Sequence, residues 1–354
     1  MTNNNFKRML GSGARAGVLP LAGLLLAACG GGSVSGTGSD DDGSVPLSSE
    51  SDVLREVSLL SGAVSAINTL SSAIGGSGFA ATSASSQPGL MRVPASKAQS
   101  TEAAVADSPC TDGGTDTQTS GTKTHSFIYF GNLPAPVAYQ VDTFTACKRT
   151  QTDASTGASY QVTLDGVAEA GGTLVAVSGA DYRYLIAGTG STPLQAAIAT
   201  GPALLTLKVL GTEEFKSTDS RVTVGGVLTL DYTASAGSTN SSGEIDLGTG
   251  STPFYVGSSQ TAPATSLDGP YAYHTTKCDG GSATAATTAD LTSASDDQGS
   301  YINGGTLKLS TTSAAVTVVF NNDGSASYTF QSGSSGTLSR DELDNAIQNN
   351  SCGF

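Results

Sequence analysis

The sequence predicts a mainly β fold, an antiparallel sandwich or barrel with one N-terminal amphipathic helix and a short C-terminal helix. Three observations support this prediction. Stretches in which apolar and polar residues alternate recur from residue 110 onward. Clusters of Gly, Asn, Asp and Ser separate them, as turns separate the strands of antiparallel sheets. The three- to four-residue apolar spacing of helices occurs in only two places, near residue 60 and near residue 345.

The alternating stretches place apolar side chains on one face of each predicted strand. We expect Asp165-Gly166 to end one strand and Gly225-Gly226 to separate two others. The faces of these strands are carried by Tyr139, Val141, Thr143, Thr145 and Cys147, by Tyr160, Val162 and Leu164, by Leu205, Leu207 and Val209, by Val222 and Val224, and by Leu228, Leu230 and Tyr232.

The clearest hairpin lies near the end of the chain. Val316, Val318 and Phe320 alternate up to residues 321–324, Asn-Asn-Asp-Gly, and the alternation resumes at Tyr328. Asn, Asp and Gly tolerate the positive φ angles of tight turns, so this segment predicts two paired strands. A short helix follows, because Ser339 and Glu342 form a capping box in front of Leu343, Ala346 and Ile347.

The N-terminal helix is predicted over residues 51–74. Its apolar stripe recurs at three- and four-residue steps and consists of Val53, Val57, Leu60, Val64, Ile67, Leu70 and Ile74. Ser49 with Asp52, or Ser51 alone, can cap its start, and Gly75-Gly76 can end it. The narrow stripe is compatible with docking on the β domain or with pairing to a second copy as a coiled coil. We expect docking on the protein's own sheet.

The composition divides the chain into five segments. We assign 1–28 to a signal peptide, 29–50 to a flexible tether, 51–75 to the helix, 76–108 to an Ala/Ser/Pro-rich linker and 109–354 to a β domain, with two subunits splitting near 260 as an alternative. Within the β domain, residues 188–193 (Gly-Thr-Gly-Ser-Thr-Pro) recur unchanged at 248–253, and 162–167 is similar to 222–227. Both matches lie sixty positions apart, which a duplicated unit would explain.

The net charge excludes one class of partner. The 354-residue chain carries 16 basic and 30 acidic residues, and the first 28 residues hold three of the basic ones, Lys7, Arg8 and Arg15. The remainder therefore has a net charge of 13 − 30 = −17. A surface this acidic cannot neutralise a row of phosphates, so we expect no nucleic-acid binding.

No catalytic constellation stands out in the sequence. His125 and His274 are the two histidines, and each lies in an alternating β stretch where a structural role is typical. The motifs of nucleophile elbows and of zinc proteases are absent. We therefore predict no catalytic residue, no metal site and no cofactor. Asp and Glu are plentiful, so a hydrolase that uses paired carboxylates stays open as the alternative.

The first 29 residues carry a resemblance to a known family. Lys7, Arg8 and Arg15 precede an apolar run that ends in Leu26-Ala27-Ala28-Cys29, and the run is too short to span a bilayer. This arrangement resembles the lipobox of bacterial lipoproteins. The resemblance implies that Cys29 is acylated, as with palmitate, and becomes the first residue of the mature protein. Gly30 stands where many inner-membrane lipoproteins carry Asp, which favours the outer membrane.

Export also bears on the cysteines. With Cys29 assigned to the lipid, four cysteines remain, an even number that is typical of two disulfides in an exported chain. Three pairings are possible. We favour Cys110–Cys147 and Cys278–Cys352, because each pair closes a segment that forms its own unit.

The strand with a cysteine, the polar turn and the strand ending in Leu-Asp-Gly, at 139–167, resemble those of β-rich lipoproteins of proteobacteria, and this likeness adds no functional residue. The sequence thus predicts a non-enzymatic, lipid-anchored protein of the cell envelope with a binding or structural role. Cys29 would supply the membrane contact, on the periplasmic or the surface side. A protein or glycan partner is left unidentified, a surface adhesin is a further alternative, and the 51–74 helix offers a route to oligomers.

Overall fold

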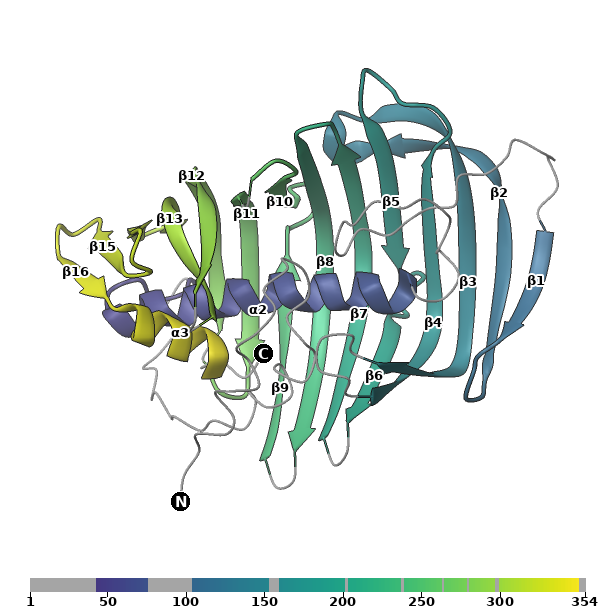
Figure 1. The fold of residues 1–354 in the computed structure, drawn as a ribbon, viewed down its shortest axis with the longest axis horizontal. Coiled ribbons are helices and arrows are strands. Elements are labelled where there is room, and N and C mark those ends of the chain that lie inside the picture. The colour runs from purple at the N-terminus through teal and green to yellow at the C-terminus, as the bar shows by residue number, and fades with distance from the viewer. Residues whose placement is uncertain are drawn as a thin grey trace.

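The computed structural model describes residues 43–75, 104–152, 159–200, 203–236, 239–262, 264–278, 280–296 and 299–349. The predicted signal peptide, Cys29, Cys352 and most of the predicted linker lie outside these residues. The described part is mainly β, as predicted, and all of its strands belong to one sixteen-stranded sheet in which every ladder is antiparallel (Figure 1).

The strands follow the chain almost in order across the sheet, β1-β2-β3-β4-β5-β7-β8-β10-β11-β12-β13-β14-β15-β16. Their bounds are β1 Ala104–Pro109, β2 Thr115–Phe127, β3 Leu133–Thr152, β4 Ser159–Thr173, β5 Asp181–Ala187, β6 Leu194–Thr200, β7 Ala203–Ser217, β8 Arg221–Ala236, β9 Thr239–Leu247, β10 Phe254–Ser259, β11 Ala264–Thr275, β12 Gly281–Asp296, β13 Gly299–Ser310, β14 Ala315–Phe320, β15 Ala326–Phe330 and β16 Ser335–Leu338. A 3-10 turn, η1 (Ile128–Phe130), joins β2 to β3.

This architecture corrects the predicted sandwich or barrel. Within the described ranges, β1 pairs only with β2 and β16 pairs only with β15, so the sheet is single and open. Strand alternation shows that one face of each strand is buried, but it does not say whether the sheet splits, closes or stays open. The sheet also continues past residue 260, where β10 pairs directly with β11.

Two positions in the sheet are filled by interrupted strands. β5 and β6 lie end to end between β4 and β7, and β9 and β10 lie end to end between β8 and β11. The interruptions are the two Gly-Thr-Gly-Ser-Thr-Pro loops. Both glycines of each loop have a positive φ, 81° and 59° in one loop and 77° and 53° in the other. L side chains rarely adopt such angles. Each loop is closed by two backbone hydrogen bonds between its threonines, Thr189 with Thr192 and Thr249 with Thr252.

The pairing registers show that the sixty-residue echo is structural. Four ladders of β4–β7 recur in β8–β11 with every partner moved by sixty positions. Ala168–Ala187 becomes Leu228–Leu247, Gln161–Ala199 becomes Arg221–Ser259, Arg183–Phe215 becomes Gly243–Thr275, and Gln195–Lys208 becomes Tyr255–Asp268. We call β4–β7 the first unit and β8–β11 the second unit.

Helix α2 (Glu50–Gly75) runs across the strands on one face of the sheet, which we call the inner face (Figure 1). Val53, Val57, Leu59 and Leu60 are buried in the same core as the inward side chains of β4, β8 and β11. Ser49 and Asp52 cap the helix reciprocally, with Ser49 N donating to Asp52 Oδ2 at 2.9 Å and Asp52 N to Ser49 Oγ at 3.3 Å. Neither described helix combines the length and apolar character that a membrane-spanning helix needs.

A buried carboxylate fixes this helix to the sheet. Glu56 is fully buried and accepts hydrogen bonds from the hydroxyls of Tyr271, at 2.7 Å, and Tyr273, at 2.6 Å, both on β11. Arg55 Nε donates to Glu56 at 3.1 Å, and Arg55 Nη2 donates to the Pro46 carbonyl at 3.0 Å. Burial raises the pKa of Glu56, against the opposing effects of Arg55 and the two tyrosines.

Regular structure begins inside the segments that were predicted to be a flexible tether and a linker. Val45 and Leu47 are buried in the core, and Ser44 forms a bridge with Ser282 at the start of β12. These two apolar residues flank Pro46 in a segment whose other residues are mostly Gly, Ser and Asp. That composition predicts a flexible tether, and two apolar residues are too few to change the prediction. β1 likewise starts at Ala104, inside the segment predicted to be a linker.

A β-bulge corrects the predicted face of the 139–147 strand. Phe144 pairs with Gly166 and Cys147 with Leu164, so β3 has one extra residue here, and Ala146 has φ 47°. The side-chain alternation therefore shifts, and Cys147 lies in the inner core while Tyr139 packs on a separate cluster. Asp165 Oδ1 accepts from the Ala146 N–H at 2.6 Å.

The two dipeptides that were predicted to interrupt strands lie inside them. β4 continues through Asp165-Gly166, because the aspartate satisfies the bulge and the glycine adopts φ 108°. β8 continues through Gly225-Gly226, and a Cβ on Gly225 would lie 2.6 Å from Tyr255 Cε1. These glycines therefore allow close packing rather than chain reversal.

The C-terminal elements agree with the sequence. β14 and β15 form the predicted hairpin, and α3 (Arg340–Asn349) begins with the predicted capping box, in which the Ser339 N–H donates to Glu342 at 2.7 Å. α3 packs on α2, where Ser58 Oγ donates to the Ala346 carbonyl at 2.8 Å.

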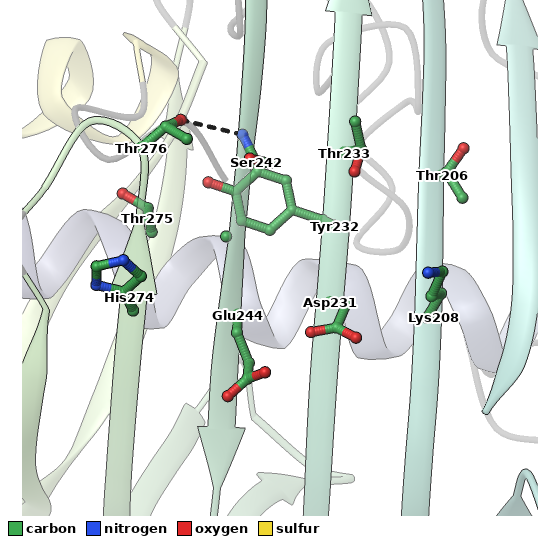
Figure 2. Close-up of a pocket in the computed structure, with 11 residues that line it drawn as sticks. Thr206, Lys208, Asp231, Tyr232, Thr233, Ser242, Glu244, His274, Thr275 and Thr276 are labelled. Carbon is green, nitrogen blue, oxygen red and sulfur yellow. Dashed lines mark hydrogen bonds between the residues drawn. The ribbon is translucent and has the colours of Figure 1, made fainter. Parts of the chain in front are cut away.

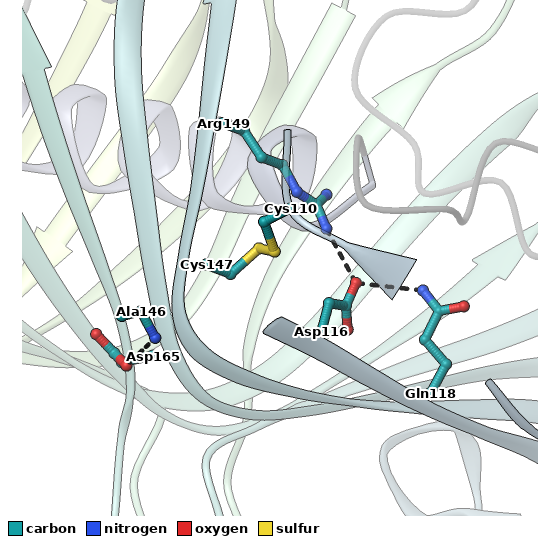
Figure 3. Close-up of a disulfide and its surroundings, with 7 residues drawn as sticks. All are labelled: Cys110, Asp116, Gln118, Ala146, Cys147, Arg149 and Asp165. Atoms are coloured by element: carbon teal, nitrogen blue, oxygen red, sulfur yellow. Dashed lines mark hydrogen bonds and ion pairs between the residues drawn. A yellow bond between two sulfur atoms is a disulfide. The ribbon is translucent and has the colours of Figure 1, made fainter. Parts of the chain in front are cut away.

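One of the two predicted disulfides is confirmed. Cys110 and Cys147 are bonded, with their Cα atoms 5.3 Å apart (Figure 3). By the chain-entropy model, closing a loop of this size stabilises the fold by roughly 4 kcal/mol. Cys278 is also disulfide-bonded. Its pairing with Cys352 stays a prediction, because Cys352 lies outside the described residues.

Leu60→Asp tests the docking of α2. Leu60 is 1% exposed in the core, so we expect a loss of roughly 3 kcal/mol or more in the free energy of unfolding, measured by urea denaturation of the monomer. Ser61→Asp, one position further and only partly buried, is the control. Unchanged unfolding together with conversion of a dimer to a monomer in light scattering would show that the helix is an oligomerisation element instead.

Candidate functional site

The face of the sheet opposite α2, which we call the outer face, carries a row of charged side chains that begins on β7, the last strand of the first unit, and continues across the second unit. Lys208 on β7 pairs with Asp231 on β8, Asp231 pairs with Glu244 on β9, and Glu244 pairs with His274 on β11. The four residues therefore form one line across four neighbouring strands. Figure 2 shows them in front of the strands with α2 behind.

Hydroxyl groups form a second row beside the charged one. Thr206 pairs with Thr233, Thr233 pairs with Ser242, and the Ser242 N–H donates to Thr276 Oγ1 at 3.1 Å. The two rows line a depression of about 420 Å³. Its full lining is Thr206, Lys208, Asp231, Tyr232, Thr233, Ser242, Gly243, Glu244, His274, Thr275 and Thr276.

The centre of the row is formed by two carboxyl groups, Asp231 and Glu244, at directly paired positions of β8 and β9. The pKa of Glu244 is raised, first by partial burial, then by a hydrogen bond with Asp231 and by the negative charges of Asp246 and Asp231, while His274 lowers it. Asp246 itself accepts a hydrogen bond from Thr229 at 2.6 Å. The side chain of Glu244 is exposed to solvent, whereas that of Asp231 is half-buried.

The other histidine lies in a covered part of the outer face. His125 on β2 stacks on Tyr184, with ring centroids 3.8 Å apart, and its Nε2 lies 3.7 Å from Glu214 Oε1. Glu214 accepts hydrogen bonds from two consecutive backbone N–H groups, those of Ile128 and Tyr129, each at 2.8 Å. His125 therefore helps to hold the tip of the β2–β3 hairpin, which is a structural role.

A second carboxyl pair lies on the inner face near the disulfide. Asp116 accepts hydrogen bonds from Arg149 at 2.9 Å and Gln118 at 3.2 Å, and Asp142 accepts from Gln140 at 2.9 Å (Figure 3 shows the Asp116 contacts). The remaining oxygens, Asp116 Oδ1 and Asp142 Oδ2, are buried, and no described group donates a hydrogen bond to either. Both carboxyls are fully buried, and burial raises the pKa of each. This pair is closed off from solvent.

A third buried acid is Glu213, whose pKa is lowered by no neighbouring charge or hydrogen bond. Glu213 on β7 points to the inner face between Leu185 and Gly226, and it is 3% exposed. Burial alone raises its pKa to about 8. Glu213 is therefore mostly neutral in the folded protein at pH 7.

The geometry favours binding over hydrolysis. Glycoside hydrolysis by two carboxyl groups needs both groups to reach the substrate, in a site that closes over it. The Asp231–Glu244 pair stands in a shallow depression that does not exclude water, and the Asp116–Asp142 pair is inaccessible. Within the described ranges, no three His, Cys, Asp or Glu side chains are grouped so that they could hold a metal ion.

Sequence reasoning missed most of this site. His274 was considered and assigned a structural role, while Lys208, Asp231 and Glu244 were not singled out. The three residues are far apart in the chain, and only the strand registers bring them into one row. The sixty-residue echo was the usable signal, because it aligns Glu244 with Tyr184 and His274 with Glu214.

Comparison with models of protein families, with curated proteins and with solved structures found no match to this chain. The assignment of the site therefore depends on its own geometry.

The buried acids predict a pH-dependent stability. Glu213 and Asp142 have folded-state pKa values above those of the unfolded chain, so the stability that their protonation provides is lost as pH rises through the folded values. We expect the free energy of unfolding to fall by on the order of 3 kcal/mol between pH 5 and pH 8.

Glu213→Gln should reduce this fall and make the protein more stable than wild type at pH 8. The urea midpoints at pH 5 and pH 8 measure both effects. Asp268→Asn removes a carboxylate from an exposed position and is the matched control. A wild-type protein that is more stable at pH 8 than at pH 5 contradicts the assignment.

Proposed function

We propose that this protein is a lipid-anchored protein of the cell envelope that binds a partner through the outer face of its second unit. The observation that carries the binding role is the continuous row Lys208–Asp231–Glu244–His274 with its neighbouring hydroxyls. A row of this kind offers donors, acceptors and both signs of charge to one ligand.

The proposed anchor depends on the sequence alone. A positive segment, a short apolar run and Leu26-Ala27-Ala28-Cys29 have the order of a lipoprotein signal peptide. Lipoprotein processing attaches more than one acyl chain, and two or more chains are needed for stable membrane attachment. We propose the outer membrane as the location, because Gly30 follows the cysteine.

The exposure of the row supports a surface that awaits a partner. Lys208, Glu244 and His274 are all exposed, whereas Tyr184 and Glu214, the first-unit counterparts of Glu244 and His274, are buried. Asp231 and Glu244 place two carboxyl groups at directly paired positions of neighbouring strands, where like charges repel, and a function that uses both groups accounts for their presence.

Cys29→Ser tests the anchor. We expect the variant to lose incorporation of labelled palmitate and to move from the membrane fraction to the soluble fraction. Cys278→Ser, which leaves the lipobox intact, should keep both the label and the membrane location. Full labelling of the Cys29 variant would falsify the anchor.

Photo-crosslinking tests the binding face. A photoreactive phenylalanine in place of Thr233, which is exposed in the depression, should form an adduct on intact envelopes, and Asp231→Asn/Glu244→Gln in the same chain should abolish it. The control carries the photoreactive phenylalanine in place of Val319, which is exposed on β14. Equal adducts at both positions, or none at Thr233, would exclude the depression as the binding site.

A further inference from the structure

The internal repeat gives the candidate site a counterpart within the same chain. In the first unit, Gly171 on β4 pairs with Tyr184 on β5, and Tyr184 pairs with Glu214 on β7. Sixty positions on, the same two pairings join Asp231 to Glu244 and Glu244 to His274. Gly171–Tyr184–Glu214 and Asp231–Glu244–His274 are therefore the same three places in two copies of one structural unit.

In the first unit these three places are covered by a turn of the same polypeptide chain. The tip of the β2–β3 hairpin crosses the outer side of β4 and β5 to reach β7, as the strand order requires (Figure 1). There Ile128 and Tyr129 present two successive backbone N–H groups to the two oxygens of Glu214. The Tyr129 carbonyl accepts from the Tyr255 hydroxyl at 2.7 Å.

A side chain that precedes the turn completes the contact. His125 stacks on Tyr184 at an interplanar angle of 9°, and Phe127 packs against both Tyr182 and Tyr184. Gly171 provides the room, because a Cβ there would lie 2.5 Å from Tyr184 Cε1. Tyr184 and Glu214 are consequently only 1% exposed.

In the second unit the corresponding three places have the same strand pairing and are open to solvent. Glu244 and His274 are exposed where Tyr184 and Glu214 are buried, and no described segment of the chain covers them. The aromatic ring of the first unit is replaced by a carboxyl group, Glu244, and the glycine by a second carboxyl group, Asp231. The frame that accepts a turn is thus kept, while its chemistry changes from aromatic to acidic.

We propose that the depression binds a turn of another polypeptide that presents successive free backbone N–H groups and a Lys or Arg side chain. His274 holds the place of Glu214, so the backbone groups would donate to the carboxylate of its neighbour Glu244 or to that of Asp231, in the way that those of Ile128 and Tyr129 donate to Glu214. The cationic side chain would pair with the neighbouring carboxyl groups of Asp231 and Glu244 and would stand where His125 stands on Tyr184. This inference rests on the proposed binding function and names its partner.

A display experiment tests the class of partner. The probe is a library of disulfide-closed ten-residue peptides, selected on the full-length chain after counter-selection on Asp231→Asn/Glu244→Gln. We expect the selected peptides to carry Lys or Arg in the turn and to bind the wild-type chain at least ten-fold more tightly than the double variant. Asp268→Asn, with a carboxylate removed from an exposed position on β11, should bind like wild type.

Backbone methylation tests the contact itself. N-methylation of the turn amides of a selected peptide should weaken binding at least ten-fold, because the donors are removed, and methylation outside the turn should not. Selected peptides that bind the double variant equally well, tolerate methylation of the turn or lack a cation overturn the proposal, as does the absence of any selected peptide. An adduct at Thr233 that proves to be a glycan overturns the turn as partner while leaving the binding function in place.

Discussion

The position of helix α2 on the sheet depends on the buried carboxyl group of Glu56. It receives two tyrosine hydroxyls from β11 and the guanidinium of Arg55, so it joins the helix to the middle of the sheet. Removing one partner of such a group leaves a charge without compensation in the interior, at a cost of about 3–5 kcal/mol. The helix therefore has one favourable position on the sheet. Because it covers the inner face, the outer face is the one that stays free to meet other molecules.

Arg55 extends this constraint to the segment before the helix. Its guanidinium bonds to the Pro46 carbonyl, and Val45 and Leu47 on either side are buried. The chain that leads from the proposed lipid anchor is thus attached to the core before the helix begins. In the proposed lipid-anchored protein, the spacing between membrane and sheet would then depend on the residues that precede Gly43.

Local patterns in the sequence predicted the elements whose signals are local. The capping boxes at Ser49 and Ser339, the hairpin of β14 and β15, and the Cys110–Cys147 bond follow from residues close in the chain or from composition. The single open sheet did not follow, because closure depends on partners at the sheet edges. The strands running through Asp165-Gly166 and Gly225-Gly226 did not follow either, because a bulge and a close tyrosine ring, both distant in sequence, explain those glycines.

The repeated registers also bear on how such a protein can change in size. A closed barrel fixes its strand number through the geometry of closure, but an open sheet has no such condition. Each unit starts with a long strand and contains one strand interrupted by a glycine-rich loop, so a unit can be added or lost between neighbours that keep their pairing. The chain is in this sense modular. The outer face can therefore differ between the two units, because one unit holds the β2–β3 turn at Glu214 and the other leaves the corresponding place open.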